Sequence, residues 1–297
     1  MSRRFFDLLT GLLARTPTCI GYALADVAGW AHYAFFRERR AAARDNIDAM
    51  LPELPAAERA RVVRGMMRSY LRMVFEFFRL PQLPTRTVLE SIEATGWESV
   101  DRGLAAGKGV IITCSHIGNW ELGAVALAHR GTPVHAVAGV QFGRWLASSV
   151  RDAKTELKVA TIAPEDGYRK LWRALARNEV VALMVDGDVF SPGVTCRFFG
   201  RETQWPSGPG AIAMRTGASV VAAYCERTGR GRFHIFLEEP LDPRDFAGAG
   251  ELNAAIASLT ERHIRTHIDQ WCIFRRLWPS ATEAAAAAVA QPERIRA

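Results

Sequence analysis

The sequence is poor in cysteine and in lysine. Its five cysteines are scattered over 297 residues, their number is odd, and none of them forms a Cys-x-x-Cys pair. This pattern excludes a disulfide framework and a cysteine-based zinc site, and it predicts reduced, mostly buried thiols in a protein that faces the cytosol. Lysine supplies only four of the 38 basic side chains, so arginine carries most of the formal net charge of +7. Arginine binds phosphate and carboxylate groups well, which favours acidic partners, although a bias in genomic base composition would give the same excess.

Several catalytic signatures are also missing. There is no Gly-x-Ser-x-Gly sequence, which excludes the nucleophile elbow of serine hydrolases, and there is no His-Glu-x-x-His zinc helix. Gly103–Gly109 superficially resembles a phosphate-binding loop, but it is one residue short, lacks the serine or threonine that holds magnesium, and precedes a strand. No nucleic-acid recognition motif accompanies the positive charge. From these signatures we expect no metal, no cofactor and no nucleic-acid partner.

The N-terminal region lacks an uninterrupted apolar run. Its most apolar stretch, Thr16–Phe36, is long enough for a membrane span but carries Asp26 at its centre, which costs about 2.5–3.5 kcal/mol on insertion scales. No small-residue cleavage site follows a short apolar core, so a secretory signal is not expected. We interpret residues 1–40 as a hydrophobic, membrane-associated helix or helical hairpin. The alternative is a buried helix that packs on the domain.

An amphipathic helix is predicted after this region. Arginines recur at three- and four-residue spacing and therefore share one face, while the opposite face is apolar. The basic residues are Arg61, Arg64, Arg68 and Arg72, and the apolar ones lie within Val63–Phe78. Pro81 and Pro84 end the helix. Such a helix suits an anionic membrane surface and equally suits packing on the protein core, and both interpretations stay open.

Beyond about residue 88, strand-like and helix-like segments alternate. The expected strands are Val110–Thr113, Val134–Val140, Val159–Ile162, Val180–Val185, Ser219–Cys225 and Arg232–Leu237. The expected helices are Glu121–His129, Trp145–Leu157, Tyr168–Arg177, Gly210–Arg215 and Leu252–Ile268. This alternation predicts an α/β fold with a mixed, mostly parallel central sheet flanked by helices, in which the last two strands form an antiparallel hairpin. We divide the chain into the N-terminal segment 1–40, a main domain over 41–280 and a flexible, alanine-rich tail over 281–297.

A histidine follows the first of these central strands, and a glutamate follows the histidine. The strand Val110–Thr113 leads to His116, and Glu121 comes five residues later in the first turn of a predicted helix, with Asn119 as its N-cap. Ligand sites in α/β sheets lie at the carboxyl ends of strands, which is where His116 falls. A carboxylate that accepts from one imidazole nitrogen leaves the other nitrogen free as a general base, so His116 and Glu121 are candidate catalytic residues. The alternative is a capping glutamate beside an ordinary histidine.

Two aspartates follow another strand of the predicted sheet. Asp186 and Asp188 come after Val180–Val185 and are expected at the same edge of the sheet as the histidine, where they would bind an acceptor hydroxyl or a metal. An ordinary Asp-Gly-Asp turn is the alternative. Further on, an aromatic loop rich in glycine and proline carries Arg197 and leads to Ser207 at the start of a helix, whose free amides are suited to an anion.

Five segments occur in order along the chain: Ser115–Glu121, Asp186-Gly187-Asp188, Phe198-Phe199-Gly200, Ser207-Gly208-Pro209 and Arg215–Ala218. Together they resemble the bacterial lipid A biosynthesis acyltransferase family, which belongs with the glycerolipid acyltransferases that carry His-x4-Asp/Glu. The resemblance also takes in Arg68-Ser69-Tyr70, Glu76–Arg79 and Asp269–Arg276, so it covers most of the chain. The mannoside acyltransferases that modify phosphatidylinositol glycolipids are similar as well.

The resemblance implies that His116 deprotonates a hydroxyl of a lipid acceptor while Glu121 holds and charges the imidazole. The alkoxide then attacks the thioester of an acyl carrier protein or of acyl-CoA, and these co-substrates take the place of a cofactor. The substrate-binding residues would be Asn119, Arg144, Arg151, Asp186, Asp188, Arg197 and Ser207. Among them, Arg151 or Arg144 would contact the acyl donor or stabilise the developing oxyanion.

It further implies a membrane-associated O-acyltransferase at the cytoplasmic face of the inner membrane. The acceptor would be a lipid A-type glycolipid, with the acyl chain in an apolar groove along the predicted helix at Met66–Phe78. A phosphatidylinositol mannoside, a lysophospholipid or an ornithine-type lipid is the alternative acceptor. A non-catalytic membrane-binding protein that retains the fold is the alternative from another functional class.

Overall fold

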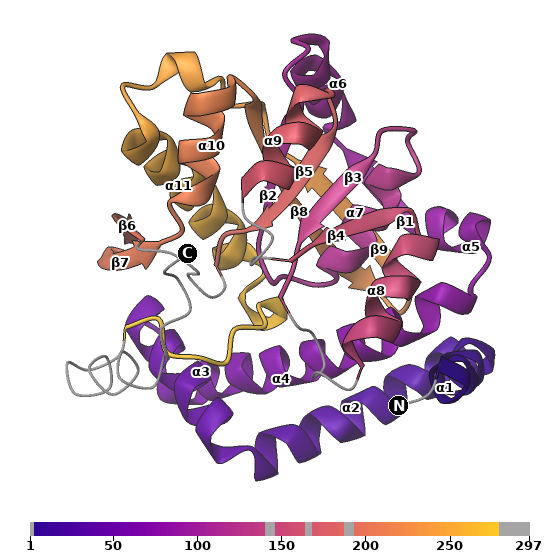
Figure 1. The fold of residues 1–297 in the computed structure, drawn as a ribbon. Coiled ribbons are helices and arrows are strands. Elements are labelled where there is room, and N and C mark those ends of the chain that lie inside the picture. The colour runs from indigo at the N-terminus through magenta and orange to yellow at the C-terminus, as the bar shows by residue number, and fades with distance from the viewer. Residues whose placement is uncertain (1–2, 140–145, 164–167, 187–192, 279–297) are drawn as a thin grey trace.

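The central sheet of the computed structural model has helices on both of its faces (Figure 1). The structure describes residues 3–139, 146–163, 168–186 and 193–278. Seven strands form the sheet in the order β1-β9-β8-β2-β5-β3-β4. Their bounds are β1 Ile92–Thr95, β2 Val110–Cys114, β3 Val134–Val137, β4 Val159–Ile162, β5 Val180–Met184, β8 Ser219–Gly229 and β9 Arg232–Leu237. Neighbouring strands in it are parallel except β8 and β9, which form an antiparallel hairpin. The predicted mixed, mostly parallel sheet is confirmed, and β1 is an edge strand that the sequence did not predict.

Both faces of the sheet are buried, which explains the continuous apolar runs of its central strands. On β2, Ile111 belongs to the core on one face and Val110 to the core on the other. A separate antiparallel hairpin of β6 (Val194–Phe198) and β7 (Arg201–Trp205) packs on the first of these cores. The sequence predicted this hairpin only as a loop.

Helices supply the rest of both cores. The core on the Ile111 side includes residues of α9, α10 and α11, and the opposite core includes residues of α5, α6 and α7. The helices are α5 Thr85–Glu90, α6 Trp97–Ala105, α7 Trp120–Ala128, α8 Ala147–Glu156, α9 Tyr168–Ala176, α10 Gly208–Thr216 and α11 Ala249–Thr266. The predicted helices at α7 to α11 are confirmed, whereas α5 and α6 were not predicted. Residues 140 and 145, where a predicted strand ends and a predicted helix begins, lie outside the described residues, as does the tail 281–297.

The helices α1 to α4 come first in the chain, and α4 lies between α2 and the sheet (Figure 1). They are α1 Arg3–Arg15, α2 Thr18–Phe35, α3 Arg37–Met50 and α4 Ala56–Arg79. α2 packs so closely on α4 that a Cβ added to Gly29 would lie 2.7 Å from the Cα of Arg68. Asp26 accepts two hydrogen bonds from the guanidinium of Arg72, at 2.6 and 2.7 Å. The charge that makes this segment unsuitable as a membrane span is therefore neutralised on the side that faces the protein.

The amphipathic helix α4 packs on the core. Met66, Met67 and Phe77 on its apolar face are buried, and Arg61 and Arg64 on the other face are exposed. The face that was expected to line an acyl groove is thus occupied by core contacts in this structure. No helix within the described ranges is both long enough and apolar enough to cross a membrane.

All five cysteines are free, and Cys196, Cys225 and Cys272 are buried, as the sequence predicts. Burial is the main cause that raises the pKa of the Cys225 thiol to about 12. A thiol with such a pKa is protonated and unreactive at neutral pH, so the buried cysteines serve as small packing residues.

Candidate active site

The ends of β2 and β5 bring a histidine and an aspartate together. The two strands are parallel neighbours in which Cys114 pairs with Met184. His116 and Asp186 each follow these paired residues by two positions, so the parallel register places them side by side. The prediction that they share one edge of the sheet is confirmed, while Asp188 lies outside the described residues.

Asp186 holds the imidazole of His116 with one carboxylate oxygen and the backbone of the same residue with the other. Oδ1 lies 2.8 Å from Nδ1 of His116, and Oδ2 accepts from the His116 backbone N–H at 2.8 Å and from Nε1 of Trp271 at 2.7 Å. Burial by itself would raise the pKa of Asp186, but the neighbouring His116 and these hydrogen bonds outweigh it and hold the pKa below its usual range. An ionised carboxylate only accepts hydrogen bonds, so Nδ1 of His116 carries a proton.

The other ring nitrogen of His116 is available to a ligand. The side chain is 25% exposed, and within the described ranges Nε2 has no hydrogen-bond partner. Trp120 packs edge-on against the imidazole, with ring centroids 4.7 Å apart, and limits its rotation. With Nδ1 as the donor to Asp186, Nε2 is the nitrogen whose lone pair can accept a proton from a ligand. The pair has the geometry of a general base with an orienting carboxylate.

Glu121 makes a different ion pair from the expected one. Its Oε1 accepts from Nζ of Lys154 at 2.9 Å, and both side chains are buried. The structure therefore corrects the prediction for the imidazole: its carboxylate partner is Asp186 of the neighbouring strand end, not Glu121. The reason is that Glu121 lies in the first turn of α7 on the side that meets α8, where Lys154 supplies a buried positive charge.

The turn after β2 is held on two sides. The backbone N–H of Cys272 donates to the carbonyl of His116 at 2.8 Å, and that of Asn119 donates to the carbonyl of Cys225 at 2.9 Å. Between them Gly118 has φ +58°, and a Cβ on it would lie 2.2 Å from the Cys225 carbonyl oxygen. Glycine is required here both for the left-handed backbone and for the close approach to β8. These contacts fix the position of His116.

Asn119 caps α7 and joins a buried ion pair. Its Oδ1 accepts from the N–H of Leu122 at 3.2 Å, which confirms the predicted N-cap. Its Nδ2 donates to Oε2 of Glu76 at 2.9 Å, and Glu76 also accepts from the guanidinium of Arg227 and from the hydroxyl of Tyr22. The side chain of Asn119 is fully buried. The structure thus gives it a role in supporting the turn, in place of the expected contact with substrate.

Two of the predicted substrate-binding arginines lie on different elements of the fold. Arg151 is exposed on α8, and Arg144 lies outside the described residues. Arg197 is exposed on β6, and the next residue, Phe198, lines a small recess beside Asp186. Within the described residues, neither Arg151 nor Arg197 forms a hydrogen bond with His116 or Asp186.

Ser207 directly precedes α10, as predicted. The amide of Gly210 in the first turn of that helix donates to Oδ1 of Asn253 at 2.9 Å. Nδ2 of Asn253 in turn donates to the carbonyl of Ser207 at 3.2 Å. One of the amides that was expected to be free for an anion is therefore occupied by a side chain of α11.

Two residues that complete the site were not assigned roles from the sequence. Trp271 binds Asp186, and Lys154 neutralises Glu121. Trp271 begins the run Trp271–Trp278, whose aromatic and basic composition was an available indication. For Lys154 the only indication was that lysine is rare in this arginine-rich chain. The sequence could not identify its partner, because that depends on how α7 and α8 pack.

Comparisons with known proteins point to one family. The family model described as bacterial lipid A biosynthesis acyltransferase matches residues 8–280. The phosphatidylinositol mannoside acyltransferase of Mycobacterium tuberculosis (strain CDC 1551 / Oshkosh) is 28% identical over 242 residues, which are 79% of this chain and 76% of that protein. The enzyme of the same name from Mycolicibacterium smegmatis is 26% identical over 79% of this chain and 78% of its own. Among solved structures, the 1-acyl-sn-glycerophosphate (LPA) acyltransferase PlsC from Thermotoga maritima aligns with 92% of this chain and 100% of that chain, at 15% identity and a TM-score of 0.40.

Proposed function

This chain belongs to the bacterial lipid A biosynthesis acyltransferase family and is an acyltransferase, and we propose that it transfers a fatty acyl chain from an acyl thioester to a hydroxyl of a membrane glycolipid. The observation that carries this proposal is the His116–Asp186 pair, which presents Nε2 of the imidazole at the carboxyl edge of the sheet. An acyl carrier protein or acyl-CoA supplies the activated carbonyl, so the proposed reaction involves no further cofactor.

In this mechanism, Nε2 of His116 accepts the proton of the acceptor hydroxyl while the hydroxyl oxygen attacks the thioester carbon. The tetrahedral intermediate collapses with cleavage of the carbon–sulfur bond, and the imidazolium returns the proton to the departing thiolate. Asp186 stays ionised and stabilises the imidazolium between the two proton transfers. The products are an ester on the acceptor and a free thiol on the carrier.

We further propose that Arg151 or Arg144 contacts the acyl donor or stabilises the developing oxyanion. A fixed cation near an oxyanion is worth several kcal/mol in acyl transfer, about 2.7–4 kcal/mol for a single donor. Arg151 is exposed on α8, one helical turn before Lys154, whose ion pair with Glu121 fastens α8 to α7. In this proposal Glu121 acts on catalysis through Lys154, by fixing the helix that carries Arg151.

The acceptor is the finer part of the proposal. The name of the matching family favours a lipid A-type glycolipid, and the names of the relatives favour a phosphatidylinositol mannoside. Both acceptors present a sugar hydroxyl on a lipid anchored in the membrane, and both carry the anionic phosphate that an arginine-rich protein would attract. We therefore propose that the acyl acceptor is a sugar hydroxyl of a glycolipid, the group that both candidate acceptors share.

Purified protein should acylate a glycolipid in vitro when it is given an acyl thioester. The assay presents acyl carrier protein and CoA thioesters in turn with a lipid A precursor, a phosphatidylinositol mannoside and a lysophosphatidic acid, and mass spectrometry detects the new ester. Transfer to either glycolipid supports the proposal and identifies the acceptor. Transfer to lysophosphatidic acid alone would overturn the glycolipid assignment, and transfer to none of the acceptors would overturn the proposed function.

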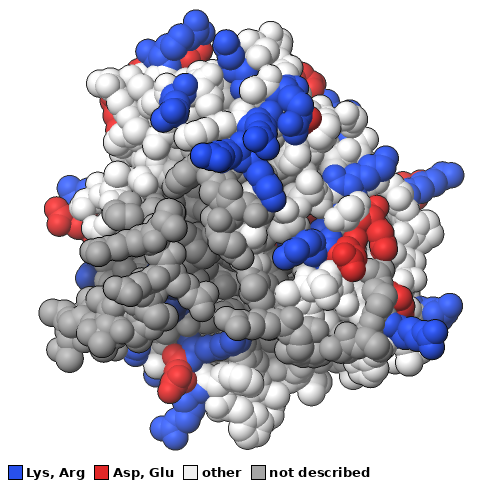
Figure 2. Space-filling view, in the orientation of Figure 1, with Lys and Arg blue, Asp and Glu red and all other residues white. Residues whose placement is uncertain are grey.

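We also propose that α1 and α2 bind the cytoplasmic face of the inner membrane. Nine large apolar side chains in and beside these helices are each more than half exposed: Phe5, Leu8, Leu12, Ile20, Leu24, Val27, Trp30, Phe35 and Phe36. Among the described residues only one further large apolar side chain, Met214, is exposed. Figure 2 shows few charged side chains along the lower edge of the molecule, where α2 runs. Such an apolar face suits insertion into the headgroup and acyl boundary of a bilayer.

Aspartate at both Leu24 and Trp30 should weaken binding to anionic vesicles by more than about tenfold, because burial of each apolar side chain is worth about 1.5–3 kcal/mol. Co-sedimentation with vesicles of phosphatidylglycerol and phosphatidylethanolamine measures this affinity. Met214→Asp is the matched control, since it adds the same charge at an exposed apolar position of α10 and should leave the affinity unchanged. Equal binding of all three proteins would contradict the proposed membrane face.

A further inference from the structure

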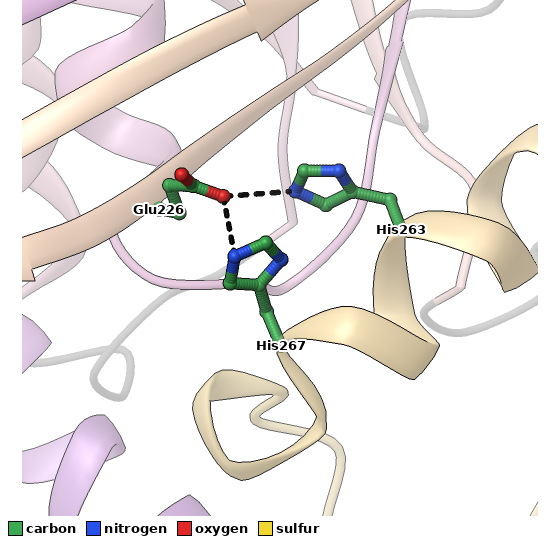
Figure 3. A group of neighbouring side chains, drawn as sticks. All are labelled: Glu226, His263 and His267. Atoms are coloured by element: carbon green, nitrogen blue, oxygen red, sulfur yellow. Dashed lines mark ion pairs between the residues drawn. The ribbon is translucent and has the colours of Figure 1, made fainter.

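A carboxylate and two imidazoles meet at the end of α11, beside β8. Glu226 lies on β8, His263 lies in the last turn of α11, and His267 is the C-cap residue that directly follows this helix (Figure 3). Oε2 of Glu226 lies 2.7 Å from Nε2 of His267 and 3.7 Å from Nε2 of His263. The ligand atoms of the three side chains all lie within 4.8 Å of one another. The three residues form what we call the α11 cluster.

The surroundings of the α11 cluster leave one nitrogen unsatisfied. The side chain of His263 is only 10% exposed, and its Nε2 is fully enclosed and has no hydrogen-bond partner among the residues that the structure describes. The rings of Tyr224 and His267 stack on it, with centroids 3.9 and 4.8 Å away. A buried polar atom without a partner is costly, and neutral imidazole is the form that binds metals.

We propose that Glu226, His263 and His267 bind one divalent transition-metal ion, with Zn²⁺ as the best match to two imidazoles and one carboxylate. Tetrahedral ligation at about 2.0–2.1 Å separates ligand atoms by about 3.3 Å, and the two distances from Glu226 lie on either side of that value. Binding gives Nε2 of His263 its missing partner. Water takes the fourth position.

A neighbouring histidine supports this assignment. Nδ1 of His234 on β9 lies 3.3 Å from Oε1 of Glu226, the carboxylate oxygen that does not face the other two imidazoles. Metal-binding carboxylates are commonly held in this way by an outer hydrogen bond, which fixes their orientation. The sequence suggested no metal, because His263 and His267 lack the glutamate of the usual zinc helix between them and their carboxylate comes from a strand 37 positions away. Only the packing of α11 on β8 brings the three together.

The ion would have a structural role. Glu226 is followed by Arg227, whose backbone N–H and carbonyl both bond to the side chain of Gln270, at 2.8 and 3.0 Å. His267 is followed within a few residues by Trp271, which binds Asp186, and by Cys272, which binds the His116 carbonyl. A metal that joins β8 to the end of α11 would therefore fix the segment that holds the catalytic pair. It would take no part in the proton transfers themselves.

Metal analysis of the full chain tests the proposal independently of catalysis. Protein treated with a chelator is dialysed against Zn²⁺ or Co²⁺, and elemental analysis measures the ion retained. We expect one ion per chain, visible absorption bands of tetrahedral Co²⁺, and a Zn²⁺-dependent rise in the melting temperature. His267→Ala and Glu226→Gln, at partly exposed positions, should weaken retention by more than about tenfold, the loss already seen for changes in the outer shell of metal sites.

His135→Ala is the matched control. Nε2 of His135 lies 2.7 Å from a carboxylate oxygen of Glu179, so this pair has the same spacing as His267 and Glu226 but no second imidazole in the group. This variant should retain one ion and the same Zn²⁺-dependent melting shift as the unaltered chain. The proposal is overturned if the unaltered chain retains no ion, if His267→Ala and Glu226→Gln retain as much as it does, or if His135→Ala abolishes retention.

Discussion

His116→Ala should leave a folded protein whose rate of acyl transfer falls by a factor of about 10²–10⁴ or more, because that factor is the usual contribution of a general base. The substitution removes a partly exposed side chain from the end of a strand, while the backbone bonds of residue 116 to Asp186 and Cys272 remain available. Steady-state kinetics with an acyl thioester and a glycolipid measure the rate, and circular dichroism confirms the fold. Full activity in this variant would exclude His116 as the base and would reopen the interpretation of the chain as a membrane-binding protein without turnover.

Asp186→Asn extends the same prediction to the carboxylate. Asparagine keeps the size of the side chain but removes the negative charge that stabilises the imidazolium, so we expect a loss of similar size with an unchanged fold. Glu179→Gln is the matched control, because Glu179 holds His135 at 2.7 Å in the same kind of pair. Glu179 precedes β5 and Asp186 follows it, so the control pair lies at the opposite edge of the sheet. If both amide variants lost activity equally, the effect of Asp186→Asn would be structural and the base–carboxylate assignment would fail.

Glu121→Gln compares the carboxylate that the sequence predicted as the partner of the imidazole with Asp186, its partner in the structure. This substitution leaves Lys154 buried without its negative partner, so its main expected effect is a lower melting temperature. At a temperature where the variant is folded, its activity should exceed that of Asp186→Asn. The reverse order would restore Glu121 as the residue that orients the imidazole.

The sequence was sufficient for the positions of the catalytic pair but not for the partner of the imidazole. Residues that end neighbouring parallel strands must meet at one edge, so His116 and Asp186 could be placed together from their strands alone. Which of two carboxylates turns toward the ring depends on the packing of α7 against α8, and no local pattern reports that. The five-residue spacing from His116 to Glu121 fits two arrangements equally well: the expected hydrogen bond between the two side chains, and the observed one, in which Glu121 lies in the first turn of α7 and binds Lys154.

The same limit applies to the elements that were missed. β1 is four residues long at the edge of the sheet, with alternating half-buried and exposed positions, so it has no apolar run to identify it. α6 begins after Gly96 in a left-handed conformation and has no side-chain cap. For α2, composition correctly indicated an apolar segment, but only the close packing of Gly29 on α4 shows which face is turned inward. Local patterns therefore identified the central strands and most of the helices, but not α3, and tertiary packing decided the rest.

The second large effect is expected in the buried ion pair of Glu76 and Arg227. The guanidinium and the carboxylate are nearly inaccessible to solvent, and Tyr22, Ser69 and Asn119 complete their hydrogen bonds. Burial would lower the pKa of Arg227, but the neighbouring Glu76 outweighs it and raises the pKa, so the guanidinium remains charged. Through Asn119 this pair supports the turn that carries the catalytic histidine.

Arg227→Met or Glu76→Gln should each lower the free energy of unfolding by about 3–5 kcal/mol, because each leaves one buried charge without its partner. Urea denaturation measures the change. The double variant should lose less than the sum of the two, since no unpaired charge remains in it, and a strictly additive loss would contradict a direct coupling between the two side chains. Arg102→Ala is the control: it removes an exposed ion pair with Glu239 and should change the free energy by less than about 0.5 kcal/mol. If Arg227→Met lowered the free energy of unfolding as little as this control, the buried ion pair would not be the interaction that stabilises the packing of α4 on β8.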